Sequence, residues 1–276
     1  MSPSESSMAK RLVASVTRVS EYLDKFLQFQ QSMISRLKTR DHVIGLMFAG
    51  SSADTSRADQ YSDQDFFLVV DDGHGELFRR NLSWLPNHEQ IVIAPRETEH
   101  GLKVVYENGD LLEFAVFEDS DLDQPWLAVG TDFKVAFETK NISARLEAAS
   151  KRALPKPFDR PKEFELFLSL VLIGVGRFRR GEKIAADQHI KSYALAHALR
   201  LIRDANPVEN PMLDTLNPYR RFEFEYPEIG TEVFSLLQLP SEDAAKKLTS
   251  VVLSAINPSQ QEANQFEVIS RRLGWN

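Results

Sequence analysis

The sequence predicts an α/β domain, a mixed sheet with flanking helices, followed by an all-α helical-bundle domain. Two changes of hydrophobic period predict this order. Apolar residues recur at helical spacing up to residue 38, short apolar runs of strand length replace them from residue 42, and helical spacing returns beyond Lys151. Hydrophobic residues make up 42% of the 276 positions, which is enough for a core in each domain.

The first segment, residues 1–40, is predicted to be an N-terminal amphipathic helix over residues 8–38. We expect it to pack on this chain's own body, and its heptad-like spacing leaves a homodimer seam as the alternative. One polar residue, Gln30, interrupts the apolar series. The series consists of Leu12, Val16, Val19, Leu23, Phe26, Met33 and Leu37.

The α/β domain is assigned to residues 41–150. Asn108-Gly109 predicts a hairpin between two of its strands, because Asn-Gly supplies the two positive-φ positions of a tight turn. A short helix is expected at Gly75–Leu85. Strands are expected at His42–Ala49, Phe66–Val70, Gln90–Ala94, Leu102–Tyr106, Leu111–Phe117 and Phe133–Phe137.

The helical domain is assigned to residues 151–276, after a linker at Leu154-Pro-Lys-Pro. Two basic clusters stand out in it, Arg177–Lys183 around Gly181 and Arg220-Arg221. The first could contact phosphates, or it could only complement a helix dipole before a glycine cap. Helices are expected at Pro161–Arg180, Ala185–Asp204, Ile229–Leu237, Glu242–Ile256 and Gln260–Leu273.

Composition excludes several classes of function. The chain has no cysteine, so it has no disulfides, no thiolate metal site and no cysteine nucleophile. No apolar run reaches the roughly 18–20 residues of a membrane span, and no signal peptide is evident. We therefore expect a cytoplasmic protein without a membrane partner.

Charge is unevenly distributed. Residues 41–150 carry 8 basic and 21 acidic side chains, a net charge of −13, against −7 for the whole chain. A nucleic-acid partner is not expected, because polyanion binding needs a basic surface. An acidic region suits metal ions and cationic ligands.

The chemistry is expected between two predicted strands. An apolar strand runs into Gly50-Ser51, eleven residues (52–62) follow, and Asp63-x-Asp65 opens the next strand. Residues i and i+2 of a strand share a face, so the two carboxylates converge on a space that divalent cations can fill. Glu113, a lone acid in an apolar strand, is the candidate third ligand, although it could instead pair with a surface Lys or Arg.

Gly50 lets the backbone approach a phosphate because it has no Cβ. The Ser51 hydroxyl and the following amides, from Ser52 on, can donate to phosphate oxygens, above all where Ser52–Arg57 begins a helix. Gln64, between the aspartates, should point to the opposite face of the strand and meet a polar neighbour there.

Together, Gly50-Ser51, the eleven-residue interval, Asp63-x-Asp65-Phe66 and the strand acid Glu113 resemble the signature of the DNA polymerase beta nucleotidyltransferase superfamily. The acidic α/β domain followed by a helical domain is similar to its aminoglycoside and lincosamide nucleotidyltransferase branch. In that superfamily the residue between the two aspartates is usually apolar, and this sequence departs from the pattern with Gln64.

The resemblance implies an enzyme that moves a nucleoside monophosphate, most simply AMP from ATP, to a hydroxyl of a small acceptor such as a cationic aminoglycoside. It implies two Mg²⁺ ions on Asp63 and Asp65, with Glu113 completing the metal site or serving as base, and nucleotide binding at Gly50, Ser51 and Ser52. Nucleotidylation of a protein target in a toxin-like system and a non-catalytic nucleotide-sensing module are the alternatives.

Overall fold

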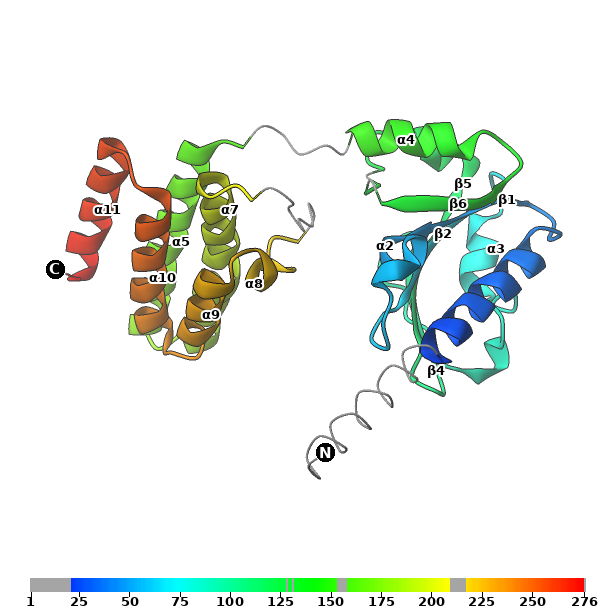
Figure 1. Ribbon diagram of the computed structural model, residues 1–276, viewed down its shortest axis with the longest axis horizontal. Helices are drawn as coiled ribbons and strands as arrows, with labels where there is room; N and C mark the ends of the chain where they lie inside the picture. Colours follow the sequence, from blue (N-terminus) through cyan, green and yellow to red (C-terminus); the bar gives the residue numbers. More distant parts are fainter. Residues whose placement is uncertain (1–20, 128, 131, 153–157, 209–216, 276) are drawn as a thin grey trace, which may run out of the picture. The chain divides into compact units, whose positions relative to one another are not determined.

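A computed structural model describes residues 21–127, 129–130, 132–152, 158–208 and 217–275 (Figure 1). The chain divides into two compact units, Met1–Leu154 and Pro155–Asn276. The predicted fold class is confirmed, because a mixed six-stranded sheet with helices precedes a helical region. Within the described ranges, no helix combines the length and apolar character needed to cross a membrane.

The sheet of the first unit has the strand order β3-β4-β5-β2-β1-β6. Its central pair, β2 and β5, is parallel, and the other neighbouring pairs are antiparallel. Each strand overlaps its predicted range. The strands are β1 (Val43–Ala49), β2 (Gln64–Val70), β3 (Ile91–Ile93), β4 (Gly101–Tyr106), β5 (Leu111–Glu118) and β6 (Phe133–Glu138).

Helices cover both faces of this sheet. The helix over residues 21–37 and α3 (Gly75–Arg80) pack on one face, where Met33 joins the sheet residues Phe66 and Phe114 in one core (Figure 1). The other face packs against α4 (Ile142–Arg152). Packing of the N-terminal helix on its own chain is thereby confirmed for residues 21–37, and residues 8–20 lie outside the described residues.

Two local predictions need correction, and one helix was not predicted. The helix predicted over Gly75–Leu85 ends at Arg80, because Asn81 starts a turn by accepting a hydrogen bond from the Ser83 amide. At the hairpin only Gly109 has a positive φ (+88°), so the turn is not the type with two left-handed residues. Helix α4 was not predicted, although its apolar residues follow helical spacing.

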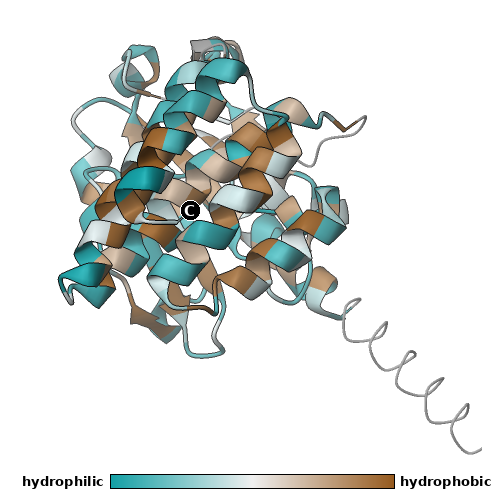
Figure 2. Ribbon diagram, turned by 90° about the vertical axis from the view of Figure 1, so that its left-hand side faces the viewer, coloured by the Kyte–Doolittle hydropathy of each residue, from teal (hydrophilic) through white to brown (hydrophobic). Residues whose placement is uncertain are grey.

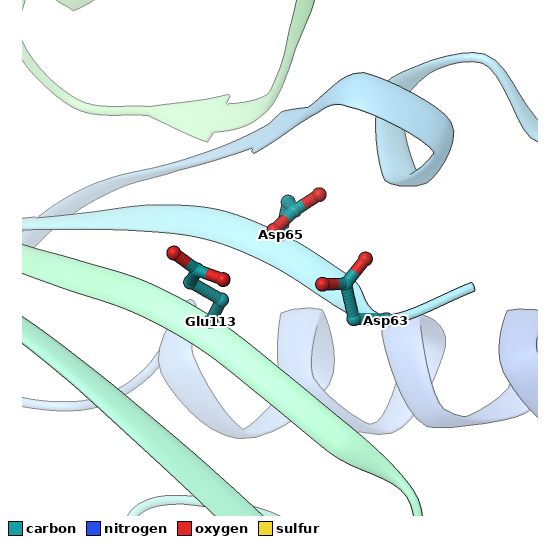
Figure 3. Close-up of side chains that lie close together, drawn as sticks. All are labelled: Asp63, Asp65 and Glu113. Carbon is teal, nitrogen blue, oxygen red and sulfur yellow. The ribbon is translucent and has the colours of Figure 1, made fainter. Parts of the chain in front are cut away.

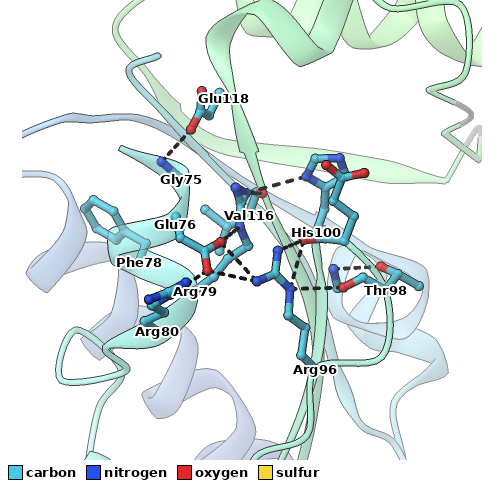
Figure 4. Close-up of polar contacts among 12 residues, drawn as sticks. Gly75, Glu76, Phe78, Arg79, Arg80, Arg96, Thr98, His100, Val116 and Glu118 are labelled. Carbon is cyan, nitrogen blue, oxygen red and sulfur yellow. Dashed lines mark hydrogen bonds and ion pairs between the residues drawn. The ribbon is translucent and has the colours of Figure 1, made fainter. Parts of the chain in front are cut away.

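An ionic network fastens α3 to the sheet (Figure 4). The Glu76 carboxylate accepts hydrogen bonds from Arg80, Arg79 and Arg96, which lower its pKa from 4.5 to about 2. The mostly buried Arg79 also donates to the Val116 carbonyl at 2.8 Å. The network therefore joins α3 to β5 and to the segment before β4.

The second unit contains helices with apolar inner faces. Figure 2 shows brown and teal bands alternating along these helices, as amphipathic packing requires. The helix predicted at Ala185–Asp204 contains a π-helical turn (His189–Ala194), and the short α8 was not predicted. The helices are α5 (Arg160–Arg179), α6 (Lys183–Gln188), α7 (Leu195–Ala205), α8 (Phe222–Glu225), α9 (Pro227–Leu236), α10 (Ser241–Ile256) and α11 (Gln260–Leu273).

Candidate active site

Three carboxylates meet on one face of the sheet, at the start of β2 and β5 (Figure 3). Asp63 directly precedes β2, Asp65 is the second residue of β2, and Glu113 is the third residue of β5. Alternation along a strand places Asp63 and Asp65 on the same face, and the parallel register places Asp65 beside Glu113. One carboxylate oxygen from each residue lies within 4.8 Å of the other two. The structure thus brings together all three acids proposed from the sequence.

This cluster suits a hard divalent cation. It offers only oxygen ligands, which Mg²⁺ prefers. Oxygens bound to one Mg²⁺ stand at most about 4.2 Å apart, twice the Mg–O distance. Small side-chain rotations would therefore bring the three acids to bonding distance. Asp63 and Asp65 are half-buried, so the site is open to a ligand and yet partly shielded from water.

Glu113 also has a cationic neighbour, which sequence reasoning did not identify. Lys103 lies opposite Glu113 in the β4–β5 pairing, with its Nζ 3.4 Å from the Glu113 carboxylate and 2.8 Å from Glu97. The hydrogen bond to Glu97, followed by the charge of Glu113, raises the pKa of Lys103. Glu113 therefore pairs with a lysine, as one interpretation expected, and also converges with the aspartates, where its role as third metal ligand stays a prediction.

The turn after β1 brings backbone against this cluster. Gly50 has a φ of +55°, and a Cβ built on it would stand 3.2 Å from Asp65 Oδ2. The Gly50 amide donates to the Asp132 carbonyl, and its own carbonyl accepts from Arg57 Nη2 at 3.1 Å. Gly50 therefore lies close to Asp65, where a side chain would press on a candidate metal ligand, and its approach to a phosphate stays a prediction.

The segment beyond Gly50 differs from the expected helix. Helix α2 (Gly50–Ala53) is a single turn, and a 3-10 turn (Thr55–Arg57) follows after a break at Asp54. The Asp54 carboxylate accepts from the Ser56 amide and so starts the second turn. Arg57, which was not singled out from the sequence, pairs with Asp54 at 3.1 Å and with Asp132 at 3.3 Å.

The two serines of this turn differ in environment. Ser51 is half-buried, whereas Ser52 is only 2% exposed. The Ser52 Oγ accepts a hydrogen bond from the Asp65 amide at 2.9 Å. The Ser52 hydroxyl therefore supports the backbone of Asp65, and Ser51 carries the more accessible hydroxyl.

Gln64 behaves as its position in the strand predicts. Its side chain lies on the face opposite the carboxylates, is 6% exposed, and accepts a hydrogen bond from Gln30 Nε2 at 3.1 Å. The predicted polar neighbour is confirmed. That neighbour, Gln30, is the residue that interrupts the apolar series of the N-terminal helix.

The first basic cluster is paired within the helical unit. Arg177 and Arg180 both contact Glu182, and Arg179 contacts Glu242. These ion pairs and the glycine at the helix end fit the structural interpretation of the cluster, and contact with phosphates stays a prediction. Two other basic side chains of this unit also have partners, Lys191 with Asp187 at 3.1 Å and His189 with the Ala185 carbonyl.

No family model matches the sequence, and no curated protein is significantly similar to it. Among solved structures, a nucleotidyltransferase-like protein from Exiguobacterium sibiricum is 15% identical, with 82% of this chain and 74% of that chain covered and a TM-score of 0.36. An aminoglycoside 6-adenyltransferase from Bacillus subtilis is 12% identical, with 89% and 97% covered and a TM-score of 0.32. The STING-associated CdnE c-di-GMP synthase from Capnocytophaga granulosa is 12% identical, with 92% and 82% covered and a TM-score of 0.30. These are likenesses at low identity, and they do not distinguish one branch of nucleotidyltransferases from another.

Proposed function

We propose that the chain is a metal-dependent nucleotidyltransferase, whose chemistry lies in the α/β domain of residues 41–150. The observation that carries the proposal is the convergence of Asp63, Asp65 and Glu113 within 4.8 Å at the start of two parallel strands, beside the Gly50 turn. Three carboxylates so close together repel one another unless cations lie between them. A site of this composition suits magnesium and the phosphates that magnesium accompanies.

In the proposed reaction the oxygen of an acceptor hydroxyl attacks the α-phosphorus of a nucleoside triphosphate, most simply ATP. The bond from the α-phosphorus to the bridging oxygen breaks, pyrophosphate leaves, and the hydroxyl proton passes to a base. Two Mg²⁺ ions would stabilise the attacking and the leaving oxygen. Asp63 and Asp65 would hold the two ions, and Glu113 would complete the site or take the proton. Gly50 and Ser51 would bind the phosphates, and the buried Ser52 would support this turn.

The surroundings favour a small cationic acceptor, such as an aminoglycoside. Beyond the three acids, Asp59 and Asp110 lie close enough to act on the Tyr22 phenol. Burial first, and then the charges of Asp110, Asp59 and Asp63, raise the pKa of Tyr22 to about 12. A negative field of this kind attracts cations and repels polyanions such as RNA.

Pyrophosphate release tests the proposal. The wild-type protein is given each of the four nucleoside triphosphates with Mg²⁺ and a panel of aminoglycosides and lincosamides. We expect release that requires both an acceptor and Asp65, and that is lost in Asp65→Asn. Asp24→Asn, at an exposed position of the N-terminal helix, removes the same charge away from the cluster and should stay active. Pyrophosphate release that persists in Asp65→Asn would contradict the proposal. If no acceptor in the panel gives release but the protein still binds nucleotide, the result would favour a protein target or a sensing role.

A further inference from the structure

Two polar residues that break the sequence pattern contact each other behind the candidate active site. Gln30 interrupts the apolar face of its helix, and Gln64 is the polar first residue of the buried face of β2, which Phe66 and Leu68 continue. Both are 6% exposed. Gln30 Nε2 lies 3.1 Å from Gln64 Oε1 and 3.0 Å from the Ser52 carbonyl oxygen, and it donates to both.

The contacts define how both amides are oriented. Gln64 Nε2 donates to the Phe26 carbonyl at 3.1 Å, so Gln64 must turn its oxygen toward Gln30. Gln30 must turn its nitrogen toward the Ser52 carbonyl, because a carbonyl only accepts. Each buried amide therefore has one orientation that satisfies its neighbours.

This buried network reaches the backbone of both aspartates through Ser52. The Ser52 Oγ accepts from the Asp65 amide at 2.9 Å, and it lies 3.4 Å from both the Asp63 carbonyl and Gln64 Oε1. A shift of Ser52 would therefore move the strand segment that carries both carboxylates. Gln30 limits that shift from the opposite face of the sheet.

A second contact from the same helix supports this segment. The Tyr22 hydroxyl donates to the Ser62 carbonyl at 2.6 Å, one residue before Asp63. The helix over residues 21–37 thus contacts the entry to β2 at two places. It therefore supports the site as well as filling the core.

We propose that Gln30 is a positioning residue for the metal site, acting through Ser52 and Gln64 on the backbone of Asp63 and Asp65. The inference rests on the proposed function, since it assumes that these carboxylates hold a cation. A stable core does not require such a network, because apolar residues at both positions would avoid burying two amides. We infer that the network serves to orient the carboxylates. Removing a group that orients a metal ligand commonly lowers metal affinity 10–100-fold.

The test measures Mn²⁺ binding to the metal-free protein by electron paramagnetic resonance, together with thermal unfolding in EDTA. Gln30→Leu keeps the size of the side chain and removes the amide. We expect Mn²⁺ affinity to fall about 10–100-fold at temperatures where the variant is fully folded. The matched control is Gln31→Leu, one residue along the same helix with an exposed side chain, which should bind Mn²⁺ as the wild type does.

A double-mutant cycle separates positioning from simple loss of stability. Ser52→Ala removes the acceptor of the Asp65 amide, and we expect the combined variant to lose little more affinity than either single variant, because both act on the same ligand. Unchanged Mn²⁺ affinity in Gln30→Leu, even with a lower unfolding temperature, would overturn the inference. If Gln30→Leu does not fold, unchanged affinity in Ser52→Ala overturns it equally.

The same titration distinguishes the two proposals. If wild type binds Mn²⁺ no better than Asp65→Asn, the metal site of the proposed function fails, and the role of Gln30 fails with it. If the wild type binds Mn²⁺ and Gln30→Leu binds it with the same affinity, the proposed function stands and only the positioning role of Gln30 is wrong.

Discussion

Asp65 lies directly beside Glu113 in the parallel pairing of β2 and β5. A parallel pair needs a crossover connection, so these acids come from segments far apart in the chain. Their convergence depends on strand register, because a one-residue slip of either strand would turn the acids of that strand to the other face. The geometry of the proposed metal site therefore depends on the core that maintains this register.

The acid cluster should destabilise the metal-free protein. Each pair of charges at this spacing costs about 1 kcal/mol in water, so Asp63→Asn, which removes the pairs with Asp65 and Glu113, should raise the unfolding midpoint in EDTA by about 4–8 °C. Mg²⁺ should raise the midpoint of the wild type and have little effect on the variant, because a ligand stabilises only a protein that binds it. Differential scanning calorimetry with and without Mg²⁺ measures both effects. A lower midpoint of the variant in EDTA would contradict this view.

A methyl group at Gly50 should harm the site more than the fold. Gly50→Ala and Gly109→Ala both place alanine at a positive φ, so each should cost about 1–2 kcal/mol of stability. At Gly109 nothing lies within 4 Å of the added Cβ, whereas at Gly50 it stands 3.2 Å from Asp65 Oδ2. We expect Mn²⁺ affinity to fall on the order of 10-fold in Gly50→Ala alone. Equal affinity in the two variants would refute this account of Gly50.

Lys103 should compete with the metal for Glu113. Its Nζ lies 3.4 Å from that carboxylate, so Lys103→Met should raise Mn²⁺ affinity a few-fold, the modest effect of an exposed ion pair. The gain should shrink at high salt, which screens exposed charges. Titrations at two ionic strengths check this, with the exposed Lys25→Met as control. A loss of affinity in Lys103→Met would show instead that the lysine supports the site.

Glu76 should make stability depend on pH in the acid range. Its pKa is lowered from 4.5 to about 2 by the hydrogen bonds from Arg80, Arg79 and Arg96. A carboxyl group with a lowered pKa in the folded state contributes stability that is present above pH 4.5 and is lost as the pH falls toward 2. Glu76→Gln should therefore lower the unfolding midpoint at neutral pH, and the difference from wild type should narrow as the pH falls through this window. The exposed Glu107→Gln serves as control, and a difference independent of pH would exclude this mechanism.

The fold class and the shared face of Asp63 and Asp65 could be predicted because both depend on local patterns, and the place of Glu113 beside Asp65 depends on the β2–β5 register. Strand spacing alone indicates that Asp63 and Asp65 share a face, and an isolated acid in an apolar strand marks Glu113. Helix α4 was missed because its apolar residues, Ile142, Leu146 and Ala149, are few and lie just before the predicted linker. The break at Asp54 was missed because capping by a side chain competes with helix continuation over a single turn.

Contacts between distant segments could not be predicted in the same way. Gln30 and Gln64 each stood out alone, but their pairing depends on how a helix rotates over a strand. The pairing of Glu113 with Lys103 depends on the β4–β5 register. The hydrogen bond from the Asp65 amide to the Ser52 hydroxyl depends on the direction of the turn after β1. These are tertiary contacts, which hydrophobic periodicity along the sequence does not predict.

The most direct test of the central claim is ATP binding by isothermal titration, because it needs no knowledge of the acceptor. If the three acids form one metal site for a nucleotide, the wild type binds ATP with Mg²⁺, and EDTA abolishes the binding. Asp63→Asn, Asp65→Asn and Glu113→Gln should each weaken it strongly, while Asp24→Asn leaves it unchanged. Binding that survives EDTA and all three substitutions would show that these carboxylates do not hold a metal for the nucleotide, and the account would be wrong.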